Sequence, residues 1–384
     1  MKHRQREHRV DRRSSRGDDA VAPRVAGYPG WMSTLPCSRP KPAFRRLPHH
    51  WRCLVVVPVA VVTGCVMLAS CSTSTESSVQ TTPSAEQTIP APGNSATVTP
   101  VHPSSAHKPH IMVLMMENES YDQIIGNTDA PYENSIASTY LRATNSYARG
   151  HYSLPNYLEI ISGQAYEASG TANDCTPSSC GPITGTNVTD QLVAAGVGWM
   201  AFMGAMPSDC SVSNAGGSGG YGVRHDPFIY FPQGRTNPAC ESDVPSDRLL
   251  TMLNSSTPPD FVFYSPSICN DGGGDASCST IANGDHFLAR QIPAIMATRW
   301  YKDGGTIIIT WDEGTDSDTS GEHGDTGGHV LTIVVSARTK GDSPDSQYVD
   351  TAGILRTIER AYGLGYLGNA AKPESGTLPL GRTS

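Results

Sequence analysis

Polar residues follow two strongly apolar runs of the sequence. The run HIMVLMM is followed by Glu117 and Asn118, and the run TIIITW by Asp312 and Glu313. Such runs are typical of strands buried on both faces of a parallel sheet, where functional groups gather at the carboxyl ends of the strands. Carboxylate and amide oxygens are ligands that hard divalent cations prefer. We therefore expect a cation site here; the alternative is that these residues only form turns and helix caps.

A histidine and a serine stand together at the expected start of a helix. His151 precedes Ser153 by two residues, and the pattern of residues 152–162 predicts a helix. The N-terminus of a helix attracts anions and favours the ionised form of a nucleophile. Ser153 is therefore a candidate nucleophile, and the alternative is that it only caps the helix. His329 follows a glycine-rich turn at the start of a strand, which places it at the same sheet edge as Asp312.

The sequence contains, in this order, the segments MMENESYDQIIG, HYSLPNYLEIISGQ, YGVRHDPFIYF, TIIITWDEG and GGHVLTIVVS. Together they resemble the bacterial phosphoesterase family of acid phosphatases and phospholipases C, within the alkaline phosphatase superfamily. The resemblance covers most of residues 108–370. It implies an alkaline phosphatase-like α/β/α sandwich with a mainly parallel central sheet. It also implies a divalent metal ion as cofactor, whose identity the sequence does not define.

The resemblance further implies roles for individual residues. It implies metal ligands at Glu117, Asn118, Asp312 and Glu313. It implies a nucleophile at Ser153, and contacts to the phosphate or the leaving group from His225 and His329. His151 is a further catalytic candidate because it lies close to Ser153. Relatives carry an aspartate where this chain has Glu313, so Glu313 either reaches the metal differently or supports a ligand. Whether one or two metals bind stays open.

We expect a metal-dependent hydrolase of phosphoric ester bonds that is similar to acid phosphatases and forms a phosphoserine intermediate. The alternative within the same chemistry is a phospholipase C or another phosphodiesterase. The alternative from another class is a surface lipoprotein that binds a ligand or a host partner without catalysis. A binding protein, however, has no need to combine several acids with a nucleophilic serine.

Apolar strands alternate with helical patterns, which predicts a mainly parallel sheet with helices on both faces. The expected strands are residues 110–116, 197–203, 260–265, 306–311 and 330–336. The expected helices are residues 152–162, 187–195, 283–299 and 349–362. The third helix is expected to bend or break at Pro293, and the Gly/Ser-rich residues 211–222 to form a surface loop. We expect one phosphoesterase domain at residues 108–370 and a flexible tail at residues 371–384.

The pattern of the N-terminal part is typical of a targeting segment. Residues 54–69 are apolar and uncharged, follow several arginines, and lead into the tetrapeptide LASC, which ends at Cys71. This order is typical of a secretory signal peptide, and the run is shorter than the roughly 20 residues of a spanning helix. LASC resembles the lipobox of bacterial lipoproteins, so residues 1–70 are expected to be an extension and signal peptide and Cys71 to carry lipid. The alternative is a transmembrane anchor.

The segment that follows Cys71 is expected to be a flexible tether. Residues 71–107 are rich in serine, threonine and proline and contain no aromatic residue. Such a composition does not bury enough apolar surface to fold. We therefore expect an exported protein that is lipid-anchored to the outer face of the cell membrane.

Charge and cysteine content agree with export. Residues 54–384 carry a net charge of −17, which argues against nucleic acid as a partner. Six cysteines in the expected domain predict three disulfides outside the cytoplasm. They are Cys175, Cys180, Cys210, Cys240, Cys269 and Cys278. The first two and the last two would close short loops and leave Cys210 for Cys240, although other pairings stay open.

Overall fold

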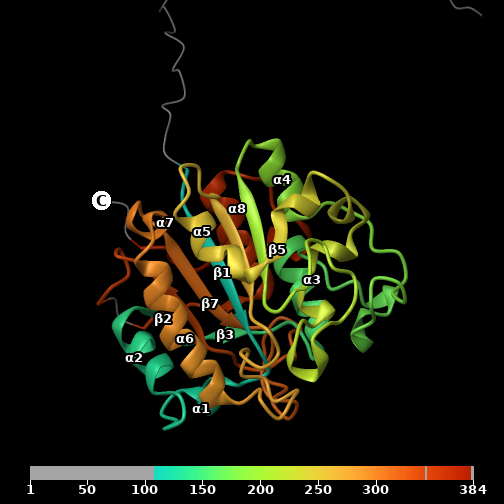
Figure 1. Ribbon diagram of the computed structural model, residues 1–384. Coiled ribbons are helices and arrows are strands. Elements are labelled where there is room, and N and C mark those ends of the chain that lie inside the picture. Colours follow the sequence, from blue (N-terminus) through green and yellow to red (C-terminus); the bar gives the residue numbers. More distant parts are fainter. Residues whose placement is uncertain (1–107, 342–343, 382–384) are drawn as a thin grey trace, which may run out of the picture. The chain divides into compact units, whose positions relative to one another are not determined.

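The computed structural model describes residues 108–341 and 344–381. The predicted extension, signal peptide and tether, including Cys71, lie outside the described residues. A seven-stranded sheet has the order β2-β8-β7-β1-β6-β4-β5 (Figure 1). Its strands are β1 (Ile111–Met116), β2 (Leu141–Ala143), β4 (Trp199–Met203), β5 (Asp243–Pro245), β6 (Phe261–Ser265), β7 (Thr306–Trp311) and β8 (Thr332–Val335). A separate two-stranded sheet pairs β3 (Ser146–Tyr147) with β9 (Val349–Asp350).

The central strand β1 shows why the apolar runs form this sheet. All of its residues are buried, and it pairs in parallel with β6 on one side and β7 on the other. Successive side chains of a strand point to opposite faces. The odd-numbered residues of β1 accordingly lie in one hydrophobic core and the even-numbered residues in another. The predicted parallel strands are confirmed, and β8 is the exception because it runs antiparallel to β7.

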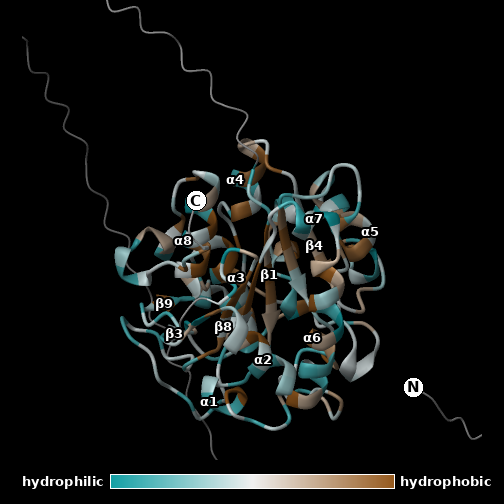
Figure 2. Cartoon of the chain, turned by 90° about the vertical axis from the view of Figure 1, so that its left-hand side faces the viewer, coloured by the Kyte–Doolittle hydropathy of each residue, from teal (hydrophilic) through white to brown (hydrophobic). Residues whose placement is uncertain are grey.

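Helices cover both faces of the large sheet. One face carries α3 (Ser153–Ser162), α4 (Val188–Ala194) and α8 (Thr351–Tyr362). The other carries α1 (Tyr121–Ile124), α2 (Pro131–Thr139), α5 (Leu249–Leu253), α6 (Ile281–Met296) and α7 (Arg299–Lys302). Hydrophobic segments concentrate in the strands between these layers (Figure 2). The predicted α/β/α sandwich is confirmed. None of the helices in the described ranges is long and apolar enough to cross a membrane.

Two predicted helices differ in detail from the structure. Pro293 lies inside α6 without ending it, and the chain forms the separate helix α7 only from Arg299. An interior proline removes one hydrogen bond, and the buried face of α6 on the core offsets that loss. The predicted helix at residues 349–362 begins with the short strand β9. Its last residue, Asp350, caps α8 by accepting the N–H of Gly353 at 2.7 Å.

The segment predicted to be a flexible tail packs on the domain up to residue 381. Leu378 is buried in the same core as α8, and its N–H donates to Oγ1 of Thr357 at 2.8 Å. Gly376 forms an isolated β-bridge with Val349. Apolar residues close to the C-terminus therefore contribute to the core.

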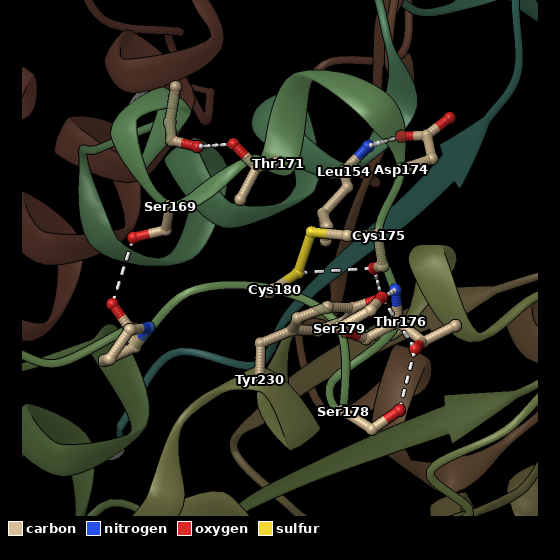
Figure 3. The surroundings of a disulfide bond; sticks show 12 residues. Leu154, Ser169, Thr171, Asp174, Cys175, Thr176, Ser178, Ser179, Cys180 and Tyr230 are labelled. Carbon is tan, nitrogen blue, oxygen red and sulfur yellow. Dashed lines mark hydrogen bonds between the residues drawn. A yellow bond between two sulfur atoms is a disulfide. The ribbon is translucent and has the colours of Figure 1, made fainter. Parts of the chain in front are cut away.

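Three disulfides fasten the loops, and the predicted pairs are confirmed. They are Cys175–Cys180, Cys210–Cys240 and Cys269–Cys278. Figure 3 shows the first of them beside the start of α3, where Asp174 contacts Leu154. The long loops of the domain are thus cross-linked at three places.

Candidate active site

Three parallel strands end at one edge of the sheet and build the site. Glu117 follows β1, Asp312 follows β7, and the loop at residues 266–280 follows β6. The backbone N–H of Asn118 donates to Oδ1 of Asp312 at 3.0 Å. The side-chain amide of Asn118 donates to the carbonyl of Gly273 at 3.3 Å. The structure therefore brings together three of the four predicted metal ligands.

Glu117 is fully buried between α3 and the loop after β6. Its Oε2 accepts a hydrogen bond from Oγ of Ser153 at 3.0 Å, and its Oε1 accepts one from the hydroxyl of Tyr157. Ser153 and Tyr157 are four residues apart on α3, so both side chains leave the same face of the helix. A Cβ atom at Gly273 would lie 2.4 Å from Cβ of Glu117. The loop therefore needs glycine where its backbone passes the acid.

The start of α3 carries Ser153 into the site. Tyr152 is the N-cap residue with a φ of 77°, which few non-glycine residues adopt. Ser153 is the first helical residue, and its hydroxyl donates to Glu117 rather than capping the helix. Instead, Oδ1 of Asp174 accepts the N–H of Leu154 at 2.9 Å (Figure 3). Asp174 is a site residue that the sequence analysis missed.

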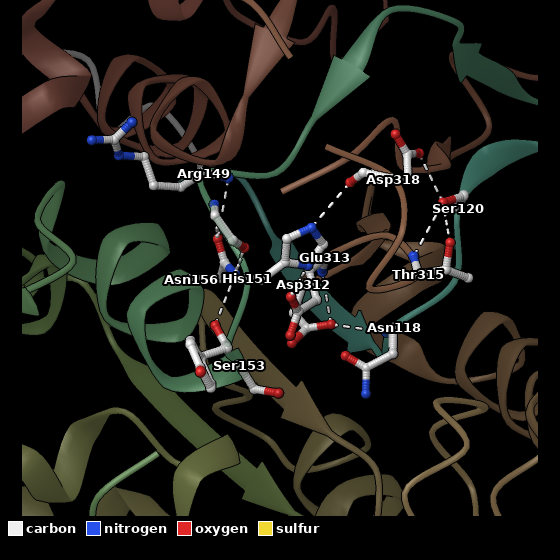
Figure 4. Close-up of polar contacts among 12 residues, drawn as sticks. Asn118, Ser120, Arg149, His151, Ser153, Asn156, Asp312, Glu313, Thr315 and Asp318 are labelled. Carbon is white, nitrogen blue, oxygen red and sulfur yellow. Dashed lines mark hydrogen bonds and ion pairs between the residues drawn. The ribbon is translucent and has the colours of Figure 1, made fainter. Parts of the chain in front are cut away.

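His151 and Glu313 form a pair in the wall of the site. Nδ1 of His151 lies 2.7 Å from Oε2 of Glu313, and Nε2 lies 3.0 Å from the carbonyl oxygen of Asp318 (Figure 4). A carbonyl only accepts hydrogen bonds, so Nε2 carries a proton. The backbone N–H of Glu313 donates to Oδ1 of Asp312 at 2.8 Å. This arrangement favours the supporting role expected for Glu313 over direct contact with a metal.

His225 is buried beside Glu117. Its Nε2 lies 3.3 Å from Oε2 of Glu117, and its Nδ1 lies 4.0 Å from Oδ2 of Asp271. The ring stacks on Tyr157, with ring centroids 5.2 Å apart. The sequence analysis missed Asp271, although polar residues after an apolar strand were the signal for the other acids and β6 gives the same signal.

His329 lies at the same sheet edge but apart from this cluster. Its ring stacks on Tyr121, with centroids 4.4 Å apart, and packs against Tyr147. Its Nε2 donates to the carbonyl of Thr144 at 3.1 Å. His329 does not line the cavity described below. In this arrangement it holds strands and loops together.

Burial shifts the pKa of five titratable groups in the site. The pKa of Glu117 lies well above its ordinary value because the acid is buried and because Asp312 and Asp271 are close. Burial raises the pKa of Asp312 and that of Asp271 to about 7. Burial and then the charge of Asp312 raise the pKa of Glu313 to about 10. Burial lowers the pKa of His225 well below its ordinary value. A bound cation would therefore stabilise the ionised forms of these acids.

Several buried polar atoms of the cluster lack hydrogen-bond partners among the described residues. They are Oδ2 of Asp312, Oδ2 of Asp271 and both ring nitrogens of His225. Buried polar atoms are normally paired. In addition, Glu117, His225 and Asp275 offer ligand atoms within 4.8 Å of one another. Oxygen and imidazole donors in this arrangement fit a divalent cation.

A cavity of about 780 Å³ opens onto Ser153. The pair of His151 and Glu313 forms part of its wall, and the loop predicted to lie at the surface, residues 211–222, forms another part. Among the described residues that line this cavity, Arg224 is the only one that carries a permanent positive charge. The cavity is therefore polar and holds one guanidinium among several acids.

Comparisons with known proteins agree with this chemistry. Residues 127–365 match the family described as "Phosphoesterase family". A phosphatidylinositol-3-phosphatase from Mycobacterium tuberculosis is 28% identical over 265 residues, which cover 68% of this chain and 80% of the relative. A probable acid phosphatase from Kluyveromyces lactis is 22% identical over 262 residues, which cover 67% of this chain and 58% of that protein.

Solved structures show a more distant similarity. A protein in the alkaline phosphatase superfamily from Vibrio parahaemolyticus gives a TM-score of 0.46 at 12% identity, covering 70% of this chain and 69% of the other. The phosphonate monoester hydrolase of Agrobacterium radiobacter gives a TM-score of 0.46 at 13% identity, covering 71% of this chain and 78% of the other.

Proposed function

The chain belongs to the phosphoesterase family and is a hydrolase of phosphoester bonds, and from this premise we propose that it cleaves phosphomonoesters through a phosphoserine at Ser153, with the help of a divalent cation. One observation carries the proposal. Ser153 is the first residue of α3 and lines the cavity, and its Oγ donates to Oε2 of Glu117 at 3.0 Å.

Ser153 is placed to attack phosphorus. The N-terminus of α3 favours the anion that develops on Oγ, and the hydrogen bond to Glu117 orients the hydroxyl. In the first half-reaction, the hydroxyl proton leaves Oγ for the solvent as a bond forms between Oγ and phosphorus, the bond from phosphorus to the alcohol oxygen breaks, and the departing oxygen takes up a proton. In the second, a water oxygen bonds to phosphorus and the bond to Oγ breaks. Ser153 then regains its proton and phosphate leaves.

Glu117, Asn118 and Asp312 would hold the cation. These residues follow β1 and β7 at the carboxyl edge of the sheet, where the backbone N–H of Asn118 donates to Oδ1 of Asp312. Oδ2 of Asp312 has no hydrogen-bond partner within the described residues. When bound, the cation would offset the charge of the phosphoryl oxygens and lower the pKa of the serine hydroxyl. Glu313 acts through His151 in this proposal, because its carboxyl contacts that ring.

His151 would supply the proton to the departing alcohol oxygen. It lines the cavity next to Ser153. Its Nδ1 stays with Glu313, and the proton on Nε2, which the carbonyl of Asp318 accepts in the free protein, would pass to the departing oxygen once the substrate takes the place of that carbonyl. Proton transfer by a positioned side chain contributes roughly 10²–10⁴-fold to a rate. His225 is too deeply buried to line the cavity, so it is not assigned this role.

A phosphomonoester is the substrate class that we propose, because both named relatives are phosphatases. Activity should be measured on p-nitrophenyl phosphate, bis(p-nitrophenyl) phosphate, phosphatidylinositol 3-phosphate and phosphatidylcholine, each with and without a chelator. We expect hydrolysis of the monoesters and its loss with chelator. Faster hydrolysis of the diester or of phosphatidylcholine would favour a phosphodiesterase instead.

The variant Ser153→Ala tests the mechanism. We expect turnover to fall by several orders of magnitude, the scale seen when catalytic serines are removed, with the melting temperature nearly unchanged. Acid quenching during turnover should trap phosphate on Ser153, visible by mass spectrometry of its peptide. Ser162→Ala, at the other end of α3, is the matched control, because the Ser162 hydroxyl donates to the carbonyls of Leu158 and Gln164 and Ser162 does not line the cavity. A Ser153→Ala protein that retains rapid turnover contradicts the proposal.

We also propose that the protein is exported and anchored by lipid on Cys71. The three disulfides support an oxidising compartment. Cells that express the full chain should incorporate labelled fatty acid into the protein, and Cys71→Ser should abolish the label. Labelling of the Cys71→Ser protein at the wild-type level would contradict the anchor.

A further inference from the structure

We propose that Tyr152 selects the leaving group, and that the preferred substrates are phosphomonoesters of ring-shaped polyols such as sugars. Tyr152 directly precedes the proposed nucleophile Ser153, and both residues line the cavity. The tyrosine ring would lie against the C–H face of the leaving group, while neighbouring side chains bond to its hydroxyls. The inference rests on the proposed function, because it assumes that Ser153 attacks the phosphorus atom of the ester.

The backbone of Tyr152 is the first observation. Its φ of 77° and ψ of 130° lie in a region that glycine adopts readily and tyrosine rarely. The buried side chain of Asn156 holds this conformation, because its Nδ2 donates to the carbonyl of Tyr152 at 3.1 Å and to that of Gly150 at 2.7 Å. A tyrosine at this position costs stability that a glycine would not cost. Strained residues of this kind cluster at functional sites, so the tyrosine side chain is expected to have a function.

The exposure of the ring is the second observation. The side chain of Tyr152 is 51% exposed, and it makes no hydrogen bond, ion pair or ring contact within the described residues. The other tyrosine of the cavity wall, Tyr221, is buried, and its hydroxyl donates to Oδ2 of Asp226 at 2.7 Å. Tyr152 is therefore the tyrosine of the described wall whose ring is free to face a ligand. The proposed proton donor His151 is its neighbour in the sequence and lines the same cavity, so the departing alcohol lies beside this ring in the proposed mechanism.

The hydrogen-bonding groups of the same wall are the third observation. Asn214, Ser218 and Asp316 line the cavity and are exposed. Oδ1 of Asn214 accepts the N–H of Val223 at 2.8 Å, which leaves the two N–H groups of its amide for a ligand. Asp316 forms no hydrogen bond or ion pair within the described residues, so both of its carboxylate oxygens can accept from hydroxyls. An aromatic face beside amide and carboxylate groups fits a ring with C–H faces and hydroxyl edges, whereas an alkyl chain would displace water from these groups without replacing its hydrogen bonds.

A matched pair of substrates tests the inference on the full chain. Glucose 6-phosphate and glucitol 6-phosphate have equal numbers of carbon atoms and both release a primary alcohol, but only the first contains a ring. We expect the wild type to hydrolyse the ring ester with a kcat/KM that is higher by about 5- to 10-fold, the size of one ring contact. Tyr152→Gly should remove this preference by raising KM for the ring ester. Tyr152→Phe should keep the preference, as should Tyr366→Ala, which changes an exposed tyrosine outside the cavity.

Two further measurements separate the ring contact from folding and from the proposed function. Tyr152→Gly relieves the strained backbone, so we expect it to melt no lower than the wild type. Calorimetry with Ser153→Ala, and with Ser153→Ala combined with Tyr152→Gly, compares binding of the two esters without turnover. No ring preference in the wild type, an equal fall in kcat/KM for both esters in Tyr152→Gly, or loss of the preference in Tyr152→Phe would overturn the inference. Tyr152-dependent binding of the ring ester by a chain that hydrolyses no phosphomonoester would overturn the proposed function alone.

Discussion

At the scale of single residues, Arg224 places a positive charge in the wall of the cavity, between two aspartates. Its guanidinium is paired with the carboxylate of Asp275, and its Nε lies 3.8 Å from Oδ2 of Asp174. It is partly exposed to the cavity that Ser153 faces. A planar guanidinium held in this way is preorganised to donate two hydrogen bonds to a phosphoryl group.

Replacing Arg224 should therefore weaken phosphate binding. A hydrogen bond to a charged group contributes roughly 1.5–3 kcal/mol, so we expect Arg224→Met to raise the inhibition constant of inorganic phosphate by about 10- to 100-fold. Arg224→Lys should recover part of the loss, because it restores the charge without the planar geometry. Steady-state inhibition at fixed pH measures both effects.

A matched control exists outside the cavity. Arg248 forms an ion pair with Asp209, with Nη1 and Oδ2 3.1 Å apart, and does not line the cavity. Arg248→Met should leave phosphate inhibition unchanged. An Arg224→Met protein with the wild-type inhibition constant would show that the guanidinium has only a structural role.

The candidate site could be predicted from the sequence where its residues directly follow apolar strands. Glu117 and Asp312 are such residues, and the structure places both at one edge. Asp174 and Asp275 come from loops, and no periodicity fixes how a loop folds back over a sheet edge. The partner of Glu313 was not predictable either, because the choice between a metal and His151 depends on distances of a few ångströms.

At the scale of elements, the disulfides should contribute unequally to stability. Cys210–Cys240 closes a loop across 30 positions and Cys175–Cys180 one across 5. A cross-link stabilises mainly by restricting the unfolded chain, and more so for a longer loop. We expect the pair of substitutions Cys210→Ser and Cys240→Ser to cost roughly 3–4 kcal/mol in urea unfolding, and the corresponding change at the short loop roughly 2 kcal/mol.

The short loop offers a second readout, because Cys175 follows Asp174, which caps α3 (Figure 3). Opening Cys175–Cys180 should reduce activity more than opening Cys210–Cys240, although it costs less stability. The opposite order in stability would contradict the loop-length argument. The opposite order in activity would contradict the link between this loop and Ser153.

Strands and helices with strong periodicity were predictable, whereas short elements were not. The run that forms β1 is apolar throughout, and the run that forms β7 combines apolar residues with two threonines and is rich in β-branched side chains. Both patterns are typical of a strand buried on both faces. By contrast, β5 contains an aspartate and a proline and owes its place to pairing with β4. Residues 167–248 contain eight short 3-10 helices, whose positions depend on tertiary contacts and on Cys210–Cys240.

At the scale of the whole molecule, one buried acid links α3 to the C-terminal segment. Oε1 of Glu159 accepts from the amide of Asn369 at 2.6 Å, and its Oε2 lies 3.7 Å from Nε of Arg149. Burial raises the pKa of Glu159 to about 7, against the opposing effects of Asn369 and Arg149. The folded protein therefore holds this proton more tightly than the unfolded chain does.

The free energy of unfolding should accordingly fall as the pH rises from about 4.5 towards 7, by up to about 1.4 kcal/mol per pH unit from this group. Glu159→Gln stays neutral and keeps an oxygen for Asn369, so we expect it to lose this part of the pH dependence and to exceed the wild type in stability at pH 8. Denaturant unfolding across pH 4–8 measures the difference. The exposed change Glu374→Gln should follow the wild type; a Glu159→Gln curve parallel to the wild type would contradict the assignment.

The two outermost strands of the large sheet, β2 and β5, have three residues each, and β5 ends in Pro245, which has no N–H to donate. An open edge of this kind is where a neighbouring chain would add its own strand and start a fibre. A neighbouring chain would find very few free backbone N–H and C=O groups on β2 or on β5. Crowded copies of this protein should therefore resist growth into fibrils by strand addition to the large sheet.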